Sequence, residues 1–281
     1  SSLFLSFSLS LSLHLLMEAS SSFSALGLPE FNTPEFYGLI TLAALGPYLL
    51  TLSLYYYHFS HKKSSPPLRG EDDRPKEAHS NDWMTSIARP EGITAVVFYY
   101  LFSGLILTYL LGINVIPPAI EDLSPAPRPL SLLMYFLTFD SLMWCIHYAQ
   151  HHIPWLYHHT HAVHHTIKSP SILVALTGYL PDTCLLIILP LHVTLFLVPN
   201  GNLSTIFLFS SLSLIHLHLI HSEFSHSWDK MLRMVGIVNS WDHHVHHLRP
   251  RKNLAHFFVI LDKVAGTYQD PCQMDRLKIS K

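Results

Sequence analysis

The chain has 281 residues, of which 49% are hydrophobic and 13% are charged. Soluble domains carry about 25% charged residues, so this composition favours an integral membrane protein. The formal net charge of −2 argues against a general nucleic-acid binder. The three cysteines are scattered, which excludes a CxxC metal knuckle and a disulfide framework.

The chain begins with a low-complexity leader, which we place at residues 1–37. Its first sixteen residues alternate serine with leucine and phenylalanine, and Met17 is a candidate for the true start. No basic segment precedes the apolar run, which argues against a secretory signal peptide.

Five apolar segments follow, and each is a candidate membrane-spanning helix, which needs about 20 mostly apolar residues. They cover residues 38–59, 93–116, 130–146, 179–198 and 203–220. The last two are separated by a short turn and are expected to form a helical hairpin. We therefore predict an all-α integral membrane protein. Residues 38–129 form its N-terminal region, which contains the first two spans and the polar cytosolic loop between them.

Basic residues indicate the orientation of these spans. Lysine and arginine are frequent in residues 61–89 and after residue 229, whereas residues 117–129 carry one arginine and residues 199–202 none. Cytosolic loops carry the excess of basic residues. Five spans place both basic regions, and all the histidine clusters, on the cytosolic side.

Histidine is the outlier of the composition, because 18 of the 22 histidines lie between His147 and His256. The spaced ones repeat the patterns HxxxH and HxxHH, with an HxxxxH pair between the two HxxHH motifs. Residues three or four apart share one helix face, and neutral imidazole binds iron, zinc, copper and nickel. One zinc ion takes about four ligands, so the number of histidines predicts two metal ions. The predicted ligands are His147, His151, His161, His164, His165, His221, His226, His243, His246 and His247.

The remaining histidines are weaker candidates. His152, His158, His159 and His244 neighbour the spaced ones but point elsewhere on a helix, and His216 and His218 lie at the end of a span. Four carboxylates lie near the clusters and are expected to orient ligand histidines rather than to bind metal: Asp140, Asp182, Glu223 and Asp242.

The order HxxxH, HxxHH, HxxHH resembles the fatty acid hydroxylase/sterol desaturase superfamily of membrane di-iron oxygenases. The likeness extends to Asp140 before the first motif, to Leu156-Tyr157, to His221-Ser222-Glu223 and to the closing Gly266-Thr267. It covers about residues 130–271, which we predict to be the catalytic domain, followed by a tail at 272–281. Four residues depart from the family pattern: Tyr148, Leu254, Ala255 and Ala265.

This resemblance implies two iron ions, O2 as oxidant, and electrons from NAD(P)H delivered by cytochrome b5 at the endoplasmic reticulum membrane. The basic residues Lys230, Arg233, Arg249, Arg251 and Lys252 could dock an acidic donor, although membrane topology alone also explains them. The implied reaction is hydroxylation or desaturation of a sterol or sterol-like lipid. Three alternatives stay open: an acyl or alkyl lipid or specialised-metabolite oxidase of the same superfamily, a zinc membrane hydrolase, and a metal transporter.

Overall fold

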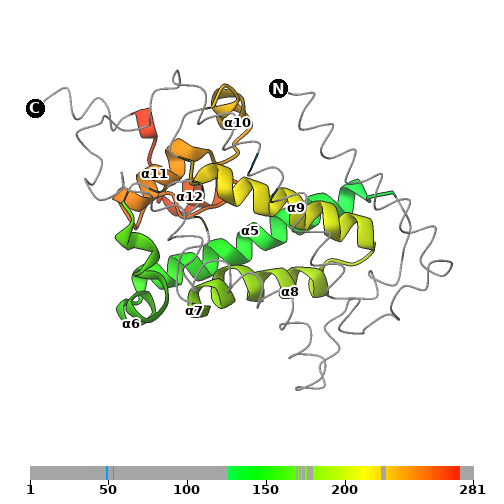
Figure 1. Ribbon diagram of the computed structural model, residues 1–281, viewed down its shortest axis with the longest axis horizontal. Helices are drawn as coiled ribbons and strands as arrows, with labels where there is room; N and C mark the ends of the chain where they lie inside the picture. Colours follow the sequence, from blue (N-terminus) through cyan, green and yellow to red (C-terminus); the bar gives the residue numbers. More distant parts are fainter. Residues whose placement is uncertain are drawn as a thin grey trace, which may run out of the picture. The chain divides into compact units, whose positions relative to one another are not determined.

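The computed structural model describes residues 49, 53, 126–168, 170, 172, 175, 180–222 and 226–272. The predicted leader, the first span apart from Leu49 and Ser53, the second span, the polar loop, Glu223 and the tail beyond Cys272 lie outside these residues. The described part is helical, with one isolated bridge between Ile237 and Phe258, which confirms the predicted fold class at that level. Its α-helices are α5 Pro129–His152, α6 Pro154–Leu156, α7 Leu180–Thr183, α8 Leu189–Leu197, α9 Leu203–Ile220, α10 Asp229–Met234, α11 Ser240–Leu248 and α12 Ile260–Ala265 (Figure 1).

The third predicted span is α5, which continues six residues beyond the predicted end at residue 146. It begins at Pro129, where proline's missing N–H costs nothing, and it ends just before Ile153-Pro154, because a residue that precedes proline avoids the α conformation. Among the described helices, α5 is the one long and apolar enough to cross a membrane, and Leu133 and Met134 are exposed on it. This is weak support for a membrane protein, because buried helices of soluble proteins pass the same test.

The fourth predicted span is not one regular helix. A π-helical turn, η8 Cys184–Ile188, separates α7 from α8. The fifth predicted span corresponds to α9, whose bounds agree with the prediction. Asn202 caps its first turn, because the Asn202 Oδ1 atom accepts the backbone N–H of Thr205 at 2.9 Å.

The chain divides into two compact units. The described part of the first comprises residues 49, 53, 126–138 and 191–215. Its core includes Tyr135 and Phe209, whose ring centroids lie 5.5 Å apart. Gly201 packs so closely on Tyr135 that a Cβ at this position would overlap the tyrosine hydroxyl.

The second unit comprises the described residues of 139–190 and 216–272, and it contains every histidine of the predicted site that the structure describes. After α6, a π-helical turn, η5 Tyr157–His161, and a 3-10 turn, η6 His164–Thr166, carry the second motif. The third motif lies on α11, whose start is fixed by a capping box between Asn239 and Asp242.

Two buried carboxylates hold the loop that follows α11. Asp140 of α5 accepts the backbone N–H groups of residues 256, 257 and 258 at 3.2, 2.9 and 2.9 Å. Asp262 of α12 accepts those of Leu254 and Ala255 at 3.0 and 2.8 Å, and the indole N–H of Trp144 at 3.0 Å. A buried carboxylate is tolerated when its oxygens accept hydrogen bonds, so these contacts fix the loop against α5.

Candidate metal centre

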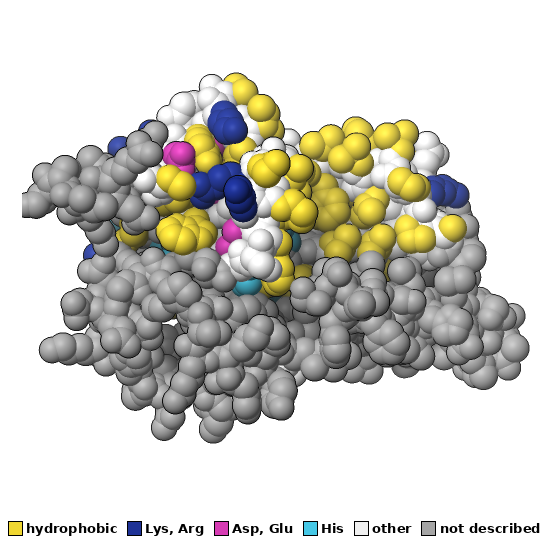
Figure 2. Space-filling model, turned by 90° about the horizontal axis from the view of Figure 1, so that it is seen from above, with side chains coloured by type: hydrophobic (Ala, Val, Ile, Leu, Met, Phe, Trp, Pro, Cys, Tyr) yellow, Lys and Arg dark blue, Asp and Glu magenta, His cyan; other side chains and the backbone are white. Residues whose placement is uncertain are grey.

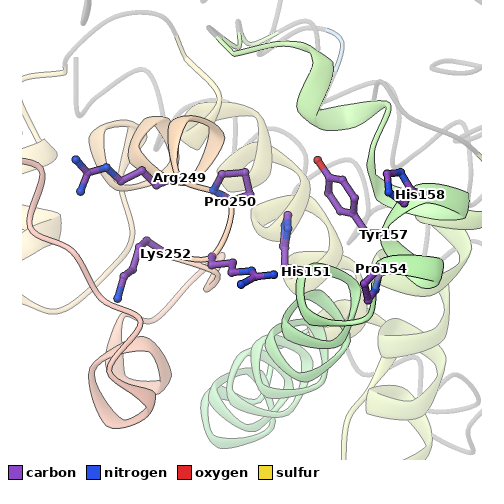
Figure 3. A pocket seen from close by; sticks show the side chains of 8 residues that line it. His151, Pro154, Tyr157, His158, Arg249, Pro250 and Lys252 are labelled. Carbon is purple, nitrogen blue, oxygen red and sulfur yellow. The ribbon is translucent and has the colours of Figure 1, made fainter.

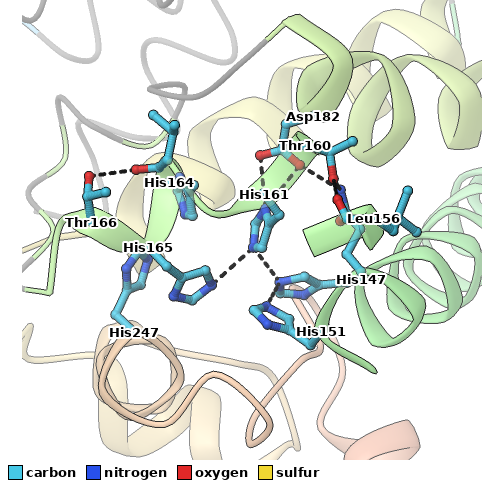
Figure 4. Close-up of polar contacts among 12 residues, drawn as sticks. His147, His151, Leu156, Thr160, His161, His164, His165, Thr166, Asp182 and His247 are labelled. Atoms are coloured by element: carbon cyan, nitrogen blue, oxygen red, sulfur yellow. Dashed lines mark hydrogen bonds and ion pairs between the residues drawn. The ribbon is translucent and has the colours of Figure 1, made fainter. Parts of the chain in front are cut away.

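Nine of the ten predicted ligands form two buried groups. The potential ligand atoms within each group lie within 4.8 Å of one another. We name them the first group, His147, His151, His161, His165 and His246, and the second group, His164, His221, His243 and His247. Figure 4 shows the rings of His147, His151 and His161 turned toward one another.

The groups do not follow the sequence motifs. Histidines four apart stay together, as in His147 with His151 (Nε2 to Nε2, 3.1 Å) and His161 with His165 (3.0 Å). The middle histidine of each HxxHH motif crosses to the other group, so His164 joins the second group and His246 the first. Each HxxHH motif therefore contributes to both groups and links them.

The hydrogen bonds of the Nδ1 atoms show that these rings turn the lone pair of Nε2 toward the other ligands of each group. The Nδ1 atoms of four ligands lie 2.6–2.9 Å from backbone carbonyl oxygens, which can only accept; the pairs are His147 with Leu254, His221 with Leu217, His246 with Lys252, and His247 with Ile167. Nδ1 therefore carries the proton, and Nε2 of the neutral ring carries a lone pair.

This protonation leaves unprotonated nitrogens facing one another. The Nε2 atoms of His147 and His161 lie 3.0 Å apart, although both rings are protonated at Nδ1. In the second group, His221 and His247 are protonated at Nδ1, and their Nε2 atoms lie 2.9 and 3.2 Å from Nε2 of His243. One N–H on His243 can serve only one of these two contacts, so at least one pair of lone pairs remains. Lone pairs at such separations repel unless a cation lies among them. The residues therefore fit a metal ion in each group, and neutral imidazole is the form that binds metals.

Burial favours the neutral rings. It lowers the pKa of His161, His243, His246 and His247 well below the usual 6.5, and the neighbouring imidazoles lower these pKa values further. Within the described residues, neither group includes a carboxylate or a cysteine. Both groups are therefore built from uncharged nitrogen donors.

Asp182 is the predicted orienting carboxylate that contacts a ligand ring. Its Oδ2 atom lies 2.9 Å from Nδ1 of His161 (Figure 4). Its Oδ1 atom accepts the side-chain N–H of Gln150 at 2.8 Å. Gln150 also donates to the hydroxyl of Thr160 at 2.8 Å. A carboxylate that accepts the outer N–H of a ligand histidine fixes the ring and raises its basicity.

The other predicted orienting carboxylates have different contacts. Asp140 binds the backbone of the 254–258 loop, and Asp242 caps α11. Asp262, which the sequence reasoning did not single out as an orienting group, holds Leu254, whose carbonyl accepts from His147. These carboxylates position ligands through the backbone, whereas Asp182 does so directly.

Two histidines differ from the sequence expectation. His226 belongs to neither group and instead lies 3.5 Å from Asp229 and stacks on Trp228. His256, which no spacing motif identifies, is buried with its ring centroid 4.9 Å from that of His147 and 5.6 Å from that of His243. It therefore contacts one member of each group.

Two cavities adjoin the groups. The larger, about 530 Å³, reaches His151 and is lined by His151, Pro154, Tyr157, His158, Arg249, Pro250, Arg251 and Lys252. Figure 3 shows His151 between Arg249 and Lys252 on one side and Tyr157 and His158 on the other. The smaller, about 40 Å³, is lined by apolar side chains such as Met143 and Leu217 and by histidines of both groups.

Comparison with known proteins shows that the part of the chain with this arrangement matches a known family. Residues 132–267 match the family described as "Fatty acid hydroxylase". This range contains all nine grouped histidines, Asp182 and His256. The part of the chain that holds these residues therefore matches the fatty acid hydroxylase family, as the motif resemblance predicted.

Three curated relatives are similar at low identity. An "Alternative squalene epoxidase" from Phaeodactylum tricornutum is 30% identical over 233 residues, which are 83% of this chain and 65% of that protein. A "Cholesterol 25-hydroxylase-like protein" from Caenorhabditis briggsae is 28% identical, covering 53% and 50% of the two chains. A "Putative Delta(7)-sterol-C5(6)-desaturase 2" from Arabidopsis thaliana is 26% identical, covering 50% and 49%.

The aligned part is thus less than two thirds of the length of each of these relatives. No solved structure matches the chain.

Proposed function

We propose that this chain is an O2-dependent oxidase of a membrane lipid, with one iron ion in each histidine group. The observation that carries the proposal is the pair of buried groups, in each of which at least two rings have Nδ1 hydrogen bonded to a backbone carbonyl and Nε2 turned toward the other ligands. Two adjacent metal ions suit a reaction that uses O2, and the family match adds support for this class. When bound, the irons would activate O2, the oxidant, for attack on an unactivated C–H bond or a double bond.

The chain's own residues supply geometry and a dry site. The ten rings contributed by the groups and His256 are at most 8% exposed, so water has little access to the centre. Asp182 and Gln150 hold the ring of His161, and Asp140 and Asp262 hold the loop whose Leu254 carbonyl orients His147. Such supporting contacts fix ligand orientation and metal affinity.

The substrate class is inferred from the relatives and from the apolar surroundings. The relative that aligns with most of this chain is named for squalene, and the others for sterols. We therefore propose a sterol or its isoprenoid hydrocarbon precursor, and the reaction as hydroxylation, desaturation or epoxidation. An acyl or alkyl lipid hydroxylase is the second candidate, favoured by the family description alone.

Electrons must come from a partner, and we propose cytochrome b5, reduced by an NAD(P)H-dependent reductase. The larger cavity supports this role, because Arg249, Arg251 and Lys252 line it beside the ligand His151. Basic and apolar side chains both lie at the surface on the face drawn in Figure 2. Arg233 is less suited to docking, because it already lies 3.2 Å from Asp270. We propose the endoplasmic reticulum membrane as location, with five spans and a cytosolic site.

Labelled oxygen tests the reaction. Membranes that contain the full chain, the reductase and cytochrome b5 are supplied with NADPH, ¹⁸O2 and, in parallel, squalene, a Δ7-sterol, cholesterol or a long-chain acyl lipid. Hydroxylation and epoxidation place one labelled atom in the product, whereas desaturation places none and removes two hydrogens. A His161→Ala chain is the matched control. Lack of any O2-dependent product on all four substrates would contradict the proposed substrate class.

Metal analysis separates the oxidase from the other classes. The oxidase is expected to hold about two irons per chain and to need O2. One zinc ion with activity in the absence of O2 would instead support the zinc hydrolase. Zinc in purified protein is not decisive by itself, because zinc binds the same imidazoles and can replace iron during expression.

A further inference from the structure

His256 is a buried imidazole that the metal groups leave unused. Its ring contacts His147 of the first group and His243 of the second, yet it is not a member of either group by the distances between ligand atoms. Within the described part of the chain, its Nδ1 atom is buried and has no hydrogen-bond partner. A buried polar atom without a partner costs free energy, so its retention points to a ligand.

The backbone of His256 is held from two sides. Its N–H donates to Asp140 of α5 at 3.2 Å, and its carbonyl accepts from the Nε2 atom of His216 of α9 at 2.9 Å. The neighbouring N–H groups of Phe257 and Phe258 also donate to Asp140. Rigid support of this kind is what positions a side chain for a precise contact.

His256 lies in the wall of the smaller cavity. His256 lines it together with His161 of the first group and with His164 and His221 of the second. The remaining walls include the apolar Met143, Leu186 and Leu217, which offer no hydrogen bonds, and two polar side chains, Asp182 and Thr183. A space of about 40 Å³ exceeds the roughly 10–15 Å³ that one water needs, but it is too small for a lipid chain.

We propose that the smaller cavity holds the small oxygen molecule used in the reaction, and that His256 donates a hydrogen bond to it. The inference rests on the proposed oxidase function and adds a residue to it. A neutral imidazole has one N–H to donate, and among the lining side chains outside the two groups, His256 carries the one N–H and Thr183 an O–H. His256 comes directly after Leu254-Ala255, where the sequence differs from the family pattern, and it belongs to none of the histidine spacing motifs.

Azide tests the proposal, because it is a small anion that binds ferric iron and accepts a hydrogen bond. The purified, oxidised, full chain is titrated with azide, and the visible absorption gives the dissociation constant. His256→Leu fills the space without a donor, and it is expected to weaken azide binding at least tenfold while the iron content stays at the wild-type value. His256→Gln restores an N–H donor and is expected to recover part of the affinity.

His244→Leu is the matched control. His244 is also buried and lies on α11, but it belongs to neither group and lines neither cavity. We expect its azide affinity to equal that of the wild type. If His256→Leu does not fold, His256→Gln is compared with His256→Asn, whose shorter side chain withdraws the amide from the cavity. We expect the His256→Asn chain to bind azide more weakly than the His256→Gln chain.

The outcomes distinguish this inference from the proposed function. Iron-loaded His256 variants that all bind azide like the wild type overturn the inference alone. Loss of iron from His256→Leu and His256→Gln makes His256 a metal ligand and also overturns the hydrogen-bonding role. A wild-type chain that holds no iron overturns both the inference and the proposed oxidase.

Discussion

The Nδ1 atom of His161 lies 2.9 Å from Oδ2 of Asp182, and Nε2 of the same ring faces His147 and His165 at 3.0 Å. One imidazole thus joins a buried carboxylate to the centre of the first group. Among the described residues, Asp182 is the carboxylate that touches a ring of either group. Its negative charge strengthens the electron donation of the His161 ring toward a metal.

We expect Asp182→Asn to lower metal affinity about 10- to 100-fold, because the amide keeps a hydrogen-bond acceptor but loses the charge. Equilibrium dialysis against a metal buffer measures this change. Asp229→Asn is a suitable control, since Asp229 is also buried and near a histidine, His226, that lies outside both groups. Equal affinities of the Asp182 and Asp229 variants would show that the contact with His161 is incidental.

Adjacent histidines of one motif are expected to affect different metal ions. His164 belongs to the four-membered second group and His165 to the five-membered first group. A site with three remaining nitrogens binds more weakly than one with four, so His164→Ala should reduce iron from about two to about one per chain, whereas His165→Ala should retain more of it. Iron analysis of the folded variants, with exposed His159→Ala as control, measures the difference. Identical losses from both variants would contradict the assignment to separate groups.

His226 is the predicted ligand that lies outside both histidine groups. Its spacing from His221 made it a predicted ligand, but the structure places it beside Asp229 and Trp228. We expect His226→Gln to leave iron content unchanged, whereas His246→Gln removes a first-group ligand and abolishes product formation. Loss of iron from the His226 variant would restore it as a ligand.

Much of the site follows from the sequence, because the i, i+4 pairs of His147, His161 and His243 lie on helical turns, where this spacing brings side chains together. The exchange of His164 and His246 between the groups does not, since it depends on how η6 and α11 face each other in space. His256 was missed for a similar reason. Its place depends on Asp140, 116 residues away, which binds its backbone rather than its ring.

The helical fold was predictable from apolar segments, and the end of α5 was not. The apolar run stops near Ile146, but the helix continues through the polar His147 and His151, whose rings are buried in the first group. Helix length here is set by the site and by Pro154 rather than by hydrophobicity. The π-helical turn η8 was also missed, since leucine and isoleucine give no local signal for it.

Asp140 is expected to contribute strongly to stability. Three backbone N–H groups donate to it in a buried setting. Asp140→Leu leaves these donors unsatisfied, at about 1–3 kcal/mol for each donor that finds no other partner. We expect a large decrease in the free energy of unfolding and less folded protein in detergent, and Asp140→Asn should be milder because its amide oxygen still accepts. An unchanged thermal unfolding midpoint for Asp140→Leu would contradict this role.

Without metal, acidification should destabilise the second unit. Burial and neighbouring imidazoles lower the pKa of His161, His243 and His247 well below 6.5 in the folded chain, whereas in the unfolded chain these groups titrate near 6.5. As the pH falls below about 6.5, the unfolded state takes up protons that the folded state does not, so stability decreases by up to about 1.4 kcal/mol per pH unit for each histidine. Unfolding of chelator-treated protein, followed over a pH series, measures the slope. His243→Gln removes one such group and should reduce the slope, while the exposed His158→Gln should not. A slope that is the same in both variants would mean that the buried rings do not govern the acid sensitivity.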